Sequence, residues 1–208
     1  MNLLVATRSP SKAREIRELL AGLPFEVMFP TDAHLERLPE EDDLEQGTSY
    51  AENAVAKARY FAQRSGRPTV TDDSGLEVDA LQGRPGVRSA RWAGGARGAA
   101  GADLDRRNNE KLLAALQEVP EAQRTARYRC VVAYLETPTA APEIVGASCE
   151  GYILDAPRGT GGFGYDPLFF STDLQMSFGE AAPGAKHRVS HRGRAFRALI
   201  EVLLRRSQ

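Results

Sequence analysis

The sequence predicts a mixed α/β domain, and three observations support this prediction. Its 208 residues are close to the length of one domain. Hydrophobic residues make up 42% and charged residues 26%, which is typical of a globular protein and excludes disordered and collagen-like classes. Strand and helix patterns alternate in the first part of the chain. A strand-rich section and a closing helix follow, and this order indicates one mixed α/β domain.

The first elements follow from hydrophobic spacing and capping signals. Residues 2–6 are apolar enough for a short buried strand, and a polar turn follows them. Apolar side chains then recur at helical spacing from Ile16 to Leu23, before a second strand candidate at 26–29. The segment Ser49-Tyr-Ala-Glu52 has capping-box spacing, which predicts a helix running to about residue 65.

The later elements are read in the same way. A third strand at 68–71 is expected to end directly at Asp72-Asp73-Ser74-Gly75. Residues 82–102 are rich in glycine and proline, which favours loops and turns. The remaining expected elements are a helix at 103–117, paired strands at 127–136 and 143–153, a glycine-rich loop at 159–166, a strand at 168–170 and a last helix from about Ser190.

Composition excludes several classes of function. The formal net charge is −1, so the broad basic surface typical of nucleic-acid binding is not expected. No apolar run approaches the ~20 residues of a membrane span, and no signal-peptide core follows Met1. Cys130 and Cys149 are lone thiols without zinc or disulfide spacing. We therefore expect a cytoplasmic protein without membrane or nucleic-acid partners.

The first candidate site is the turn between the first strand and the first helix. Backbone N–H groups at a helix start suit phosphate, and the hydroxyl and ammonium groups of this turn add donors. No Walker A sequence is present, and a serine that simply caps a surface helix would explain the same pattern. The residues of this candidate are Thr7, Arg8, Ser9, Pro10, Ser11 and Lys12.

The second candidate is the pair Asp72 and Asp73 at the end of the expected third strand. Adjacent carboxylates repel one another unless a cation or a proton relieves them, so the pair suggests a divalent metal. The acidic loop before it, with Asp42, Asp43 and Glu45, offers a further ligand. Oxygen-only ligation favours Mg²⁺ or Mn²⁺ over zinc. An ordinary Asp-rich turn is the alternative.

The third candidate is the glycine-rich segment at 159–164, which matches G-x-G-x-x-G literally. A dinucleotide-binding fingerprint opens a helix, whereas an apolar strand follows this loop, so the Rossmann interpretation fails. What remains is a loop presenting Phe163, Gly164, Tyr165 and Asp166. An aromatic ring beside a carboxylate can stack on a base and bind its edge, although a core aromatic is the common alternative.

The fourth candidate lies at the start of the last helix. Lys186, His191 and Arg192 could bind a phosphate or a base carbonyl there. A solvated basic face is the alternative, and it is the interpretation we favour for the arginines further along this helix. Only four of the 27 basic residues are lysines, namely Lys12, Lys57, Lys111 and Lys186.

Taken together, these motifs resemble the inosine triphosphate pyrophosphatases, also called dITP/XTP pyrophosphatases. The resemblance covers nearly the whole chain in the right order, and GTGGFGYDP and SHRG are its most specific segments. The family usually has asparagine at the position of Ser9, and a serine reaches less far toward a phosphate. The matching segments are Thr7–Lys12, Glu52–Ala54 with Lys57–Ala58, Asp72–Leu76, Pro85–Arg91, Gly159–Phe170 and Ser190–Gly193.

The resemblance implies a fold, an activity and residue roles. It implies a single elongated domain over residues 1–208, with a central mixed sheet flanked by helices and the active-site cleft between two lobes. A homodimer is implied as well. The implied reaction is Mg²⁺-dependent hydrolysis of ITP, dITP or XTP to the monophosphate and pyrophosphate, with Mn²⁺ as a substitute ion.

The implied roles fall on all four candidates. Residues Thr7–Lys12 would bind the triphosphate, and Lys57 belongs to a shared segment. Asp73 would be the catalytic carboxylate and a metal ligand, with Asp72 and Glu45 as further ligands. Ser74 would touch the substrate. The purine would be held by Phe163, Gly164, Tyr165, Asp166, Lys186, His191 and Arg192.

Two alternatives to this function remain open. One is a non-catalytic nucleotide-binding or RNA-binding module that uses the basic last helix; it would show strongly salt-dependent binding and no turnover. The other is a related pyrophosphatase that acts on a modified pyrimidine or a standard triphosphate. Adenine lacks the 6-oxo acceptor that a cation could bind, but the sequence does not explain how guanine would be refused.

Overall fold

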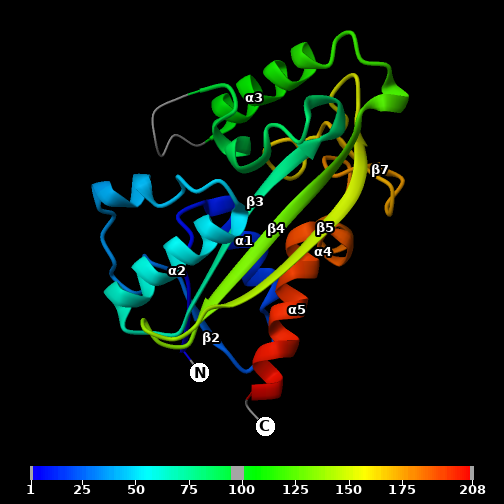
Figure 1. Ribbon diagram of the computed structural model, residues 1–208. Helices are drawn as coiled ribbons and strands as arrows, with labels where there is room; N and C mark the ends of the chain where they lie inside the picture. Colours follow the sequence, from blue (N-terminus) through cyan, green and yellow to red (C-terminus); the bar gives the residue numbers. More distant parts are fainter. Residues whose placement is uncertain (1, 95–100, 207–208) are drawn as a thin grey trace. The chain divides into compact units, whose positions relative to one another are not determined.

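A computed structural model describes residues 2–94 and 101–206, and the expected loop at 82–102 therefore lies partly outside the described residues. The predicted mixed α/β class is confirmed (Figure 1). The strands are β1 (Asn2–Val5), β2 (Glu26–Met28), β3 (Thr69–Val78), β4 (Thr125–Leu135), β5 (Glu143–Ile153), β6 (Phe169–Ser171) and β7 (Met176–Ser177). The helices are α1 (Pro10–Leu19), α2 (Tyr50–Ser65), α3 (Ala102–Ala115), α4 (Pro183–Val189) and α5 (His191–Arg206).

The strands form one seven-stranded mixed sheet. Its order is β2-β1-β3-β4-β5-β6-β7. Strand β1 pairs in parallel with β2 and β3, whereas β5, β6 and β7 pair antiparallel. Parallel pairs need crossover connections, and helices α1 and α2 supply them between the first three strands. Short 3₁₀ turns lie at Pro39–Asp43, Asp79–Leu81, Gly86–Arg91 and Glu121–Gln123.

The chain divides into two compact units. The first contains Met1–Asp73, Cys130–Gly146 and Ala195–Gln208, and the second contains Ser74–Arg129 and Ala147–Arg194. Strands β3, β4 and β5 each have residues in both units.

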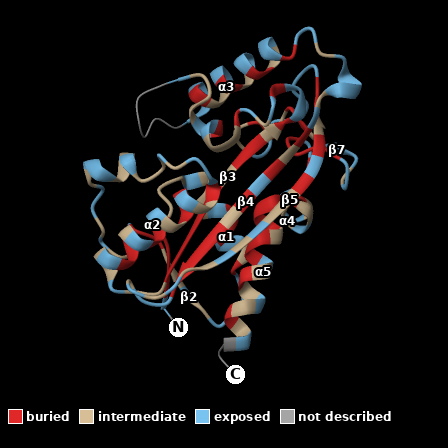
Figure 2. Ribbon diagram, in the orientation of Figure 1, coloured by how far each residue is buried: buried red, intermediate tan, exposed pale blue. Residues whose placement is uncertain are grey.

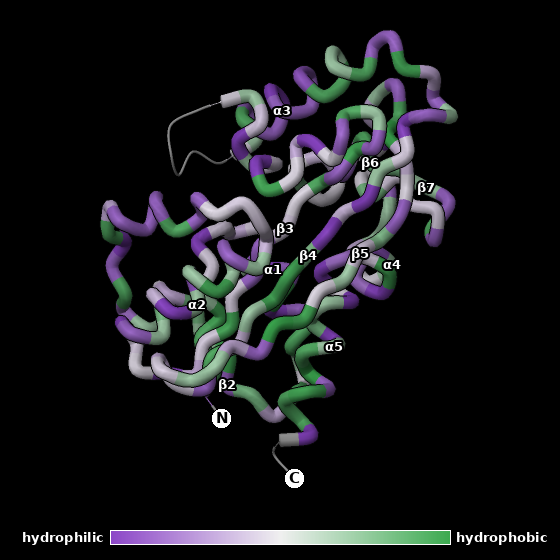
Figure 3. The backbone as a smooth tube through the Cα atoms, viewed as in Figure 1, coloured by the Kyte–Doolittle hydropathy of each residue, from purple (hydrophilic) through white to green (hydrophobic). Residues whose placement is uncertain are grey.

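Each unit has its own core (Figure 2). In the first, a face of small residues on α2, including Ala54 and Ala58, packs against Ala133 and Leu135 of β4. The C-terminal half of β4 is mainly hydrophobic, as its green colour in Figure 3 shows. In the second, large side chains form the core; they include Leu76, Leu112, Leu116, Tyr128, Phe169 and Phe178.

Helix α2 begins as the capping-box spacing predicts. The Ser49 side chain accepts a hydrogen bond from the backbone N–H of Glu52, and Glu52 accepts one from the backbone of Ser49. Gly66, with φ of 64°, closes the helix in the left-handed conformation. Among the described residues, no helix is both long and apolar enough to cross a bilayer.

Candidate active site

The turn after β1 carries a helix cap and an ion pair. Ser9 is the N-cap of α1: its Oγ accepts a hydrogen bond from the backbone N–H of Lys12 at 3.3 Å, and Pro10 is the first helical residue. Thr7 Oγ1 accepts a hydrogen bond from the backbone N–H of Ser9 at 3.2 Å. Lys12 Nζ lies 3.0 Å from Asp72 Oδ2, so the lysine of this turn reaches the second candidate site.

Arg8 has a structural partner in the acidic loop. Its Nε and Nη2 donate to the two carboxylate oxygens of Glu41 at 2.8 and 2.7 Å, and Arg64 Nη1 donates to the same carboxylate at 3.0 Å. Two-point pairing of this kind fixes the guanidinium plane. In this structure Arg8 therefore binds the acidic loop, although the sequence placed it among the phosphate ligands.

The position of Asp72 and Asp73 in the fold differs from the prediction. The predicted strand ended at Thr71, but β3 continues to Val78, so both carboxylates lie in the middle of a ten-residue strand. The turn-like composition of this segment is overridden because the strand lies between β1 and β4 in the sheet. Both residues are buried, with relative exposures of 2% and 5%.

Helix α2 supplies two polar side chains to this pair. Asn53 Nδ2 donates to Asp73 Oδ2 at 2.9 Å, and Asn53 Oδ1 accepts from the backbone N–H of Gly47 at 2.8 Å. Lys57 Nζ donates to Glu45 Oε1 at 2.6 Å and to the backbone oxygen of Asp72 at 2.5 Å. One ammonium group thus links the acidic loop to β3.

The electrostatics of this cluster shift two pKa values. Burial raises the pKa of Asp73, and the charge of Glu45 acts in the same direction, while Lys57, Lys12 and the Asn53 amide offset part of the rise. Burial alone would lower the pKa of Lys57, but the charges of Glu45, Asp73 and Asp72 together raise it above its usual value. The cluster therefore holds a carboxylate that is easier to protonate than usual beside a firmly charged lysine.

The charges of three carboxylates, Glu45, Asp72 and Asp73, all act on the Lys57 ammonium group. In the part of the chain that the structure describes, no three His, Cys, Asp or Glu side chains form a group arranged to hold a metal ion. The donor set itself consists of carboxylate oxygens, which suits Mg²⁺ and Mn²⁺. The residues present fit such an ion in their chemistry, without forming a finished ligand set.

The second unit contains the glycine-rich loop, and the rejection of the Rossmann interpretation is confirmed because β6 follows the loop rather than a helix. The Asp166 side chain binds the backbone of its own loop. Its Oδ2 accepts from the backbone N–H of Phe163 at 2.8 Å and from Lys186 Nζ at 2.6 Å. Gly162, with φ of 71°, has no space for a Cβ, which would overlap the Asp166 carboxylate.

Buried cations surround the ring of Phe163. Lys186 Nζ lies 5.1 Å and Arg192 Cζ 5.7 Å from the ring centroid. Arg192 Nη2 also donates to Ser74 Oγ at 2.8 Å. Phe163 is half-buried, whereas Lys186 and Arg192 are buried. The structure thus gathers the predicted Ser74, Phe163, Asp166, Lys186 and Arg192.

His191 is held by a different pair of neighbours. Its ring stacks on that of Tyr128, with centroids 4.6 Å apart and planes 8° from parallel. Cys149 Sγ lies 4.0 Å from His191 Nδ1. Tyr165, by contrast, belongs to the core, where its hydroxyl donates to the backbone oxygen of Ser89 at 2.9 Å. These contacts are those of a core aromatic, and the purine contact expected for Tyr165 stays a prediction.

Comparison with known proteins identifies the family. The Ham1 family model matches residues 3–202. The chain belongs to the Ham1 family. A relative from Thioalkalivibrio sulfidiphilus, named dITP/XTP pyrophosphatase, is 45% identical over 98% of each chain. A Geobacter sulfurreducens relative of the same name is 46% identical over 97% of this chain and 96% of its own. The resemblance seen in the motifs is confirmed.

Solved Ham1 structures share the fold. A HAM1 protein from Coxiella burnetii superposes with a TM-score of 0.83 at 36% identity, over 99% of both chains. A nucleoside-triphosphatase, or dITP/XTP pyrophosphatase, from Mycobacterium abscessus gives a TM-score of 0.70 at 40% identity, over 96% of this chain and 98% of its own.

Sequence reasoning missed several residues of this Ham1 chain that contact the candidates. Asn53 lies in a motif that was recognised, but no role was given to it. Tyr128, which stacks on His191, lies in a strand whose sequence indicates only a structural role in the hydrophobic core. Asp105 and Asn109 of α3 bind the backbone of Gly164, and only their spacing of four residues on a helix could have suggested a common target.

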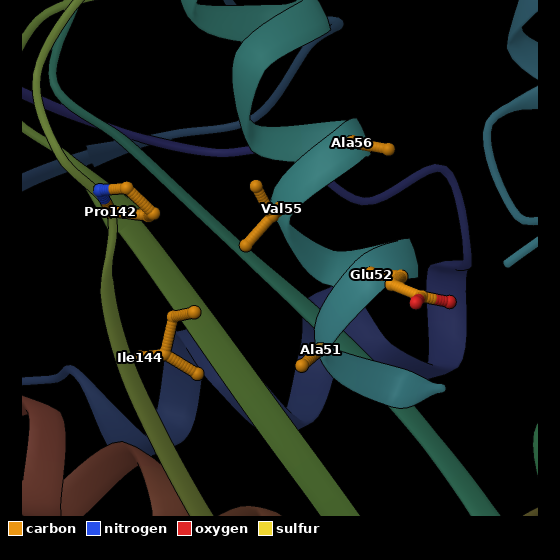
Figure 4. Close-up of a pocket in the computed structure, with 6 residues that line it drawn as sticks. All are labelled: Ala51, Glu52, Val55, Ala56, Pro142 and Ile144. Carbon is orange, nitrogen blue, oxygen red and sulfur yellow. The ribbon is translucent and has the colours of Figure 1, made fainter. Parts of the chain in front are cut away.

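An open apolar groove of about 470 Å³ lies elsewhere in the first unit (Figure 4). Its single charged residue is Glu52, whose carboxylate accepts hydrogen bonds from Thr48 and Ser49. Because it offers no cation to a phosphate, the groove does not qualify as the nucleotide site. Its lining residues are Ala51, Glu52, Val55, Ala56, Pro142 and Ile144.

Proposed function

We propose that this chain hydrolyses non-standard purine nucleoside triphosphates, ITP, dITP and XTP among them, to the monophosphate and pyrophosphate. The reaction would remove these nucleotides from the pool before they enter nucleic acid. Membership of the Ham1 family and the names of its relatives support the activity. The observation that carries the chemistry is the buried Asp73 carboxylate between Asn53 and the charged Lys57.

The phosphates are assigned to the first unit. The N-terminus of α1 offers backbone N–H groups, and Lys12 adds a positive charge that already lies 3.0 Å from Asp72. Ser11 in the first turn adds a hydroxyl. Arg8 would have to exchange its contact with Glu41 before it could bind a phosphate.

Asp73 is assigned the role of general base. A carboxylate whose pKa lies above its ordinary range accepts a proton from water more readily than an exposed one. The hydrogen bond from Asn53 holds the Oδ2 atom of Asp73 and so fixes the orientation of the carboxylate plane. Lys57 stabilises negative charge that develops beside it.

Glu45, Asp72 and Asp73 are the residues that would hold Mg²⁺, or Mn²⁺ in its place. When bound, the ion supplies positive charge to the phosphate oxygens. The protein's own contribution is to keep three carboxylates close to Lys12 and Lys57, so that their mutual repulsion is relieved before the ion arrives.

The purine is assigned to the second unit. Phe163 offers a half-buried ring for stacking. Lys186, a buried cation beside the Phe163 ring, would donate a hydrogen bond to the 6-oxo group of hypoxanthine or xanthine. Adenine has an amino donor at that position and would leave the cation facing a donor. Arg192 and His191 are the additional candidates for base contacts.

The decisive assay measures pyrophosphate and monophosphate from ITP, XTP, ATP and GTP, each with Mg²⁺ and with a chelator. A strong preference for ITP and XTP that the chelator removes is the expected result. Equal turnover of all four nucleotides would support the hydrolysis reaction but contradict the selectivity for non-standard purines. No turnover would favour a binding module instead.

Asp73→Asn tests the assignment of the base. We expect kcat to fall by about 100-fold or more, while nucleotide binding stays measurable by calorimetry. Glu77→Gln, in the same strand, is the matched control and should keep normal turnover. Normal kcat in Asp73→Asn would remove Asp73 from its role.

The homodimer and the cytoplasmic location stay predictions, as does the cleft expected between two lobes. The dimer rests on the family resemblance, and sedimentation of the purified chain tests it directly.

A further inference from the structure

Two side chains of helix α3 bind the backbone of one glycine in the loop that carries Phe163. The backbone N–H of Gly164 donates to Asp105 Oδ2 at 2.9 Å. Asn109 Nδ2 donates to the backbone oxygen of Gly164 at 3.0 Å. Asp105 and Asn109 are four residues apart and therefore lie on the same face of the helix.

These two hydrogen bonds hold the peptide planes on both sides of the Gly164 Cα atom. The rotations between those planes are the φ and ψ angles of Gly164, so the two bonds fix its conformation together. Gly164 has φ of 62°, and a Cβ built on it would meet nothing within 4 Å. A turn hydrogen bond from the Asp166 N–H to the Phe163 carbonyl oxygen, at 3.2 Å, spans this flexible residue, and the α3 side chains add two restraints at Gly164 itself.

Phe163 depends on this restraint. Its own N–H is held by Asp166, and its carbonyl belongs to the peptide plane that Asp105 binds. On the other side of Gly164, the Tyr165 hydroxyl is anchored to Ser89. The Phe163 ring, with Lys186 and Arg192 beside it, is thus aimed by a short backbone segment fixed at each end.

Helix α3 is itself anchored through Asn108, the residue that precedes Asn109. Asn108 Oδ1 accepts from the backbone N–H of Ala93 at 2.7 Å, and Asn108 Nδ2 donates to the backbone oxygen of Ala90 at 3.3 Å. Asn108 is buried, with 2% exposure. A helix anchored in this way is a firm support for the loop.

We propose that Asp105 and Asn109 are positioning residues for the purine base. They hold Gly164 so that Phe163 presents its ring in one orientation, and they act through Phe163 without touching the nucleotide. The inference rests on the proposed function, in which Phe163 contacts the purine.

The test compares kcat and KM for ITP in Asp105→Ala and Asn109→Ala. We expect KM to rise by roughly 10-fold for Asp105→Ala and by roughly 3-fold for Asn109→Ala, because a hydrogen bond to a charged group contributes more than a neutral one. In both, kcat should stay within about threefold, the pattern of lost uniform binding. Inhibition by tripolyphosphate, which has no base, should not change in either variant.

Two matched variants separate the hydrogen bond from other effects. Asp103→Ala removes the same charge from the same helix turn, but its side chain is 94% exposed, so KM should stay normal. Asp105→Asn keeps an acceptor for the Gly164 N–H and should restore most of the affinity. In a Phe163→Ala background, Asp105→Ala should change KM by less than about twofold, since residues acting through one another are not additive.

The proposal is overturned if neither variant changes KM, if Asp103→Ala has the same effect, or if the effects of Asp105 and Phe163 simply add. A parallel loss of tripolyphosphate inhibition would also overturn it, because general loosening would then explain the data. Asn109→Ala is the milder change and keeps the test valid if Asp105→Ala does not fold. Absence of turnover in the unmodified chain would contradict the proposed function instead.

Discussion

Lys186 Nζ lies 2.6 Å from Asp166 Oδ2, and the two side chains are only 6% and 4% exposed. A buried pair of this kind adds little by itself, but removal of one partner leaves a charge in a medium of low polarity. The pair therefore makes the proposed base site sensitive to substitutions that keep the shape of these side chains and alter their charge.

Lys186→Met should lower the free energy of unfolding by about 3–5 kcal/mol, because Asp166 loses its ammonium partner. Urea unfolding of the variant and of the unmodified chain measures this. The double variant Lys186→Met/Asp166→Asn removes the charge but keeps an oxygen acceptor for the Phe163 N–H, and it should recover part of the loss. If the double variant is as unstable as the single one, lost packing explains the effect and the ion pair does not.

Lys12 and Lys186 are expected to need a compact ammonium group. Lys186 lies between the rings of Phe163 and Phe178, 5.1 and 5.5 Å from their centroids, which leaves little space for a planar guanidinium. Lys12→Arg and Lys186→Arg should each lower kcat/KM for ITP by roughly 10-fold or more. The exposed Lys111, changed to arginine, is the control, and near-normal kcat/KM in both site variants would contradict the expectation.

Gly162→Ala should selectively disrupt the proposed base site. A Cβ at this position would overlap the Asp166 carboxylate, and φ of 71° adds strain. We expect KM for ITP to rise at least about 10-fold. Gly22→Ala is the matched control, because its φ of 77° is similar and nothing lies within 4 Å of its Cβ position. Similar kinetic defects in both variants would show that backbone strain alone is responsible.

Cys149 gives the protein a predictable response to alkali. Burial raises the pKa of its thiol from about 9 to about 12. Between these values the folded chain keeps a proton that the unfolded chain releases, so stability is complete below pH 9 and falls as the pH rises. The slope is at most about 1.4 kcal/mol per pH unit. Unfolding of Cys149→Ala at pH 8 to 11 should show a shallower decline, and equal declines would contradict this.

The start of α2 was the most predictable helix boundary, because the capping box at Ser49 is a local signal. The sequence did not decide whether Ser9 or another serine caps α1, its helical spacing continued to Leu23 beyond the end of α1 at Leu19, and it indicated no helix at the position of α4. The length of β3 was not predictable in the same way. Its Asp-Asp-Ser-Gly composition reads as a turn, and only pairing with neighbouring strands makes it extended.

Within the candidate site, the motif residues could be found in the sequence but their partners could not. Lys57 was recognised as part of a motif, yet its links to Glu45 and to the backbone of Asp72 depend on how α2 packs. The contact of Arg8 with Glu41 joins residues 33 positions apart. Asp105 and Asn109 looked like ordinary helix-surface residues because their target, a backbone peptide, carries no side-chain signature.

The mid-strand location of Asp73 limits how this protein can vary. Successive strand residues face opposite sides of the sheet, and Thr71 and Asp73 both reach α2, through Ala54 and Asn53. Lys12 of α1 binds the side chain of Asp72, which lies between them. A single-residue insertion or deletion between Thr69 and Asp72 would exchange these two sets of partners. Because the side of the sheet that each residue faces sets its partner, this stretch should tolerate substitutions better than any change in length.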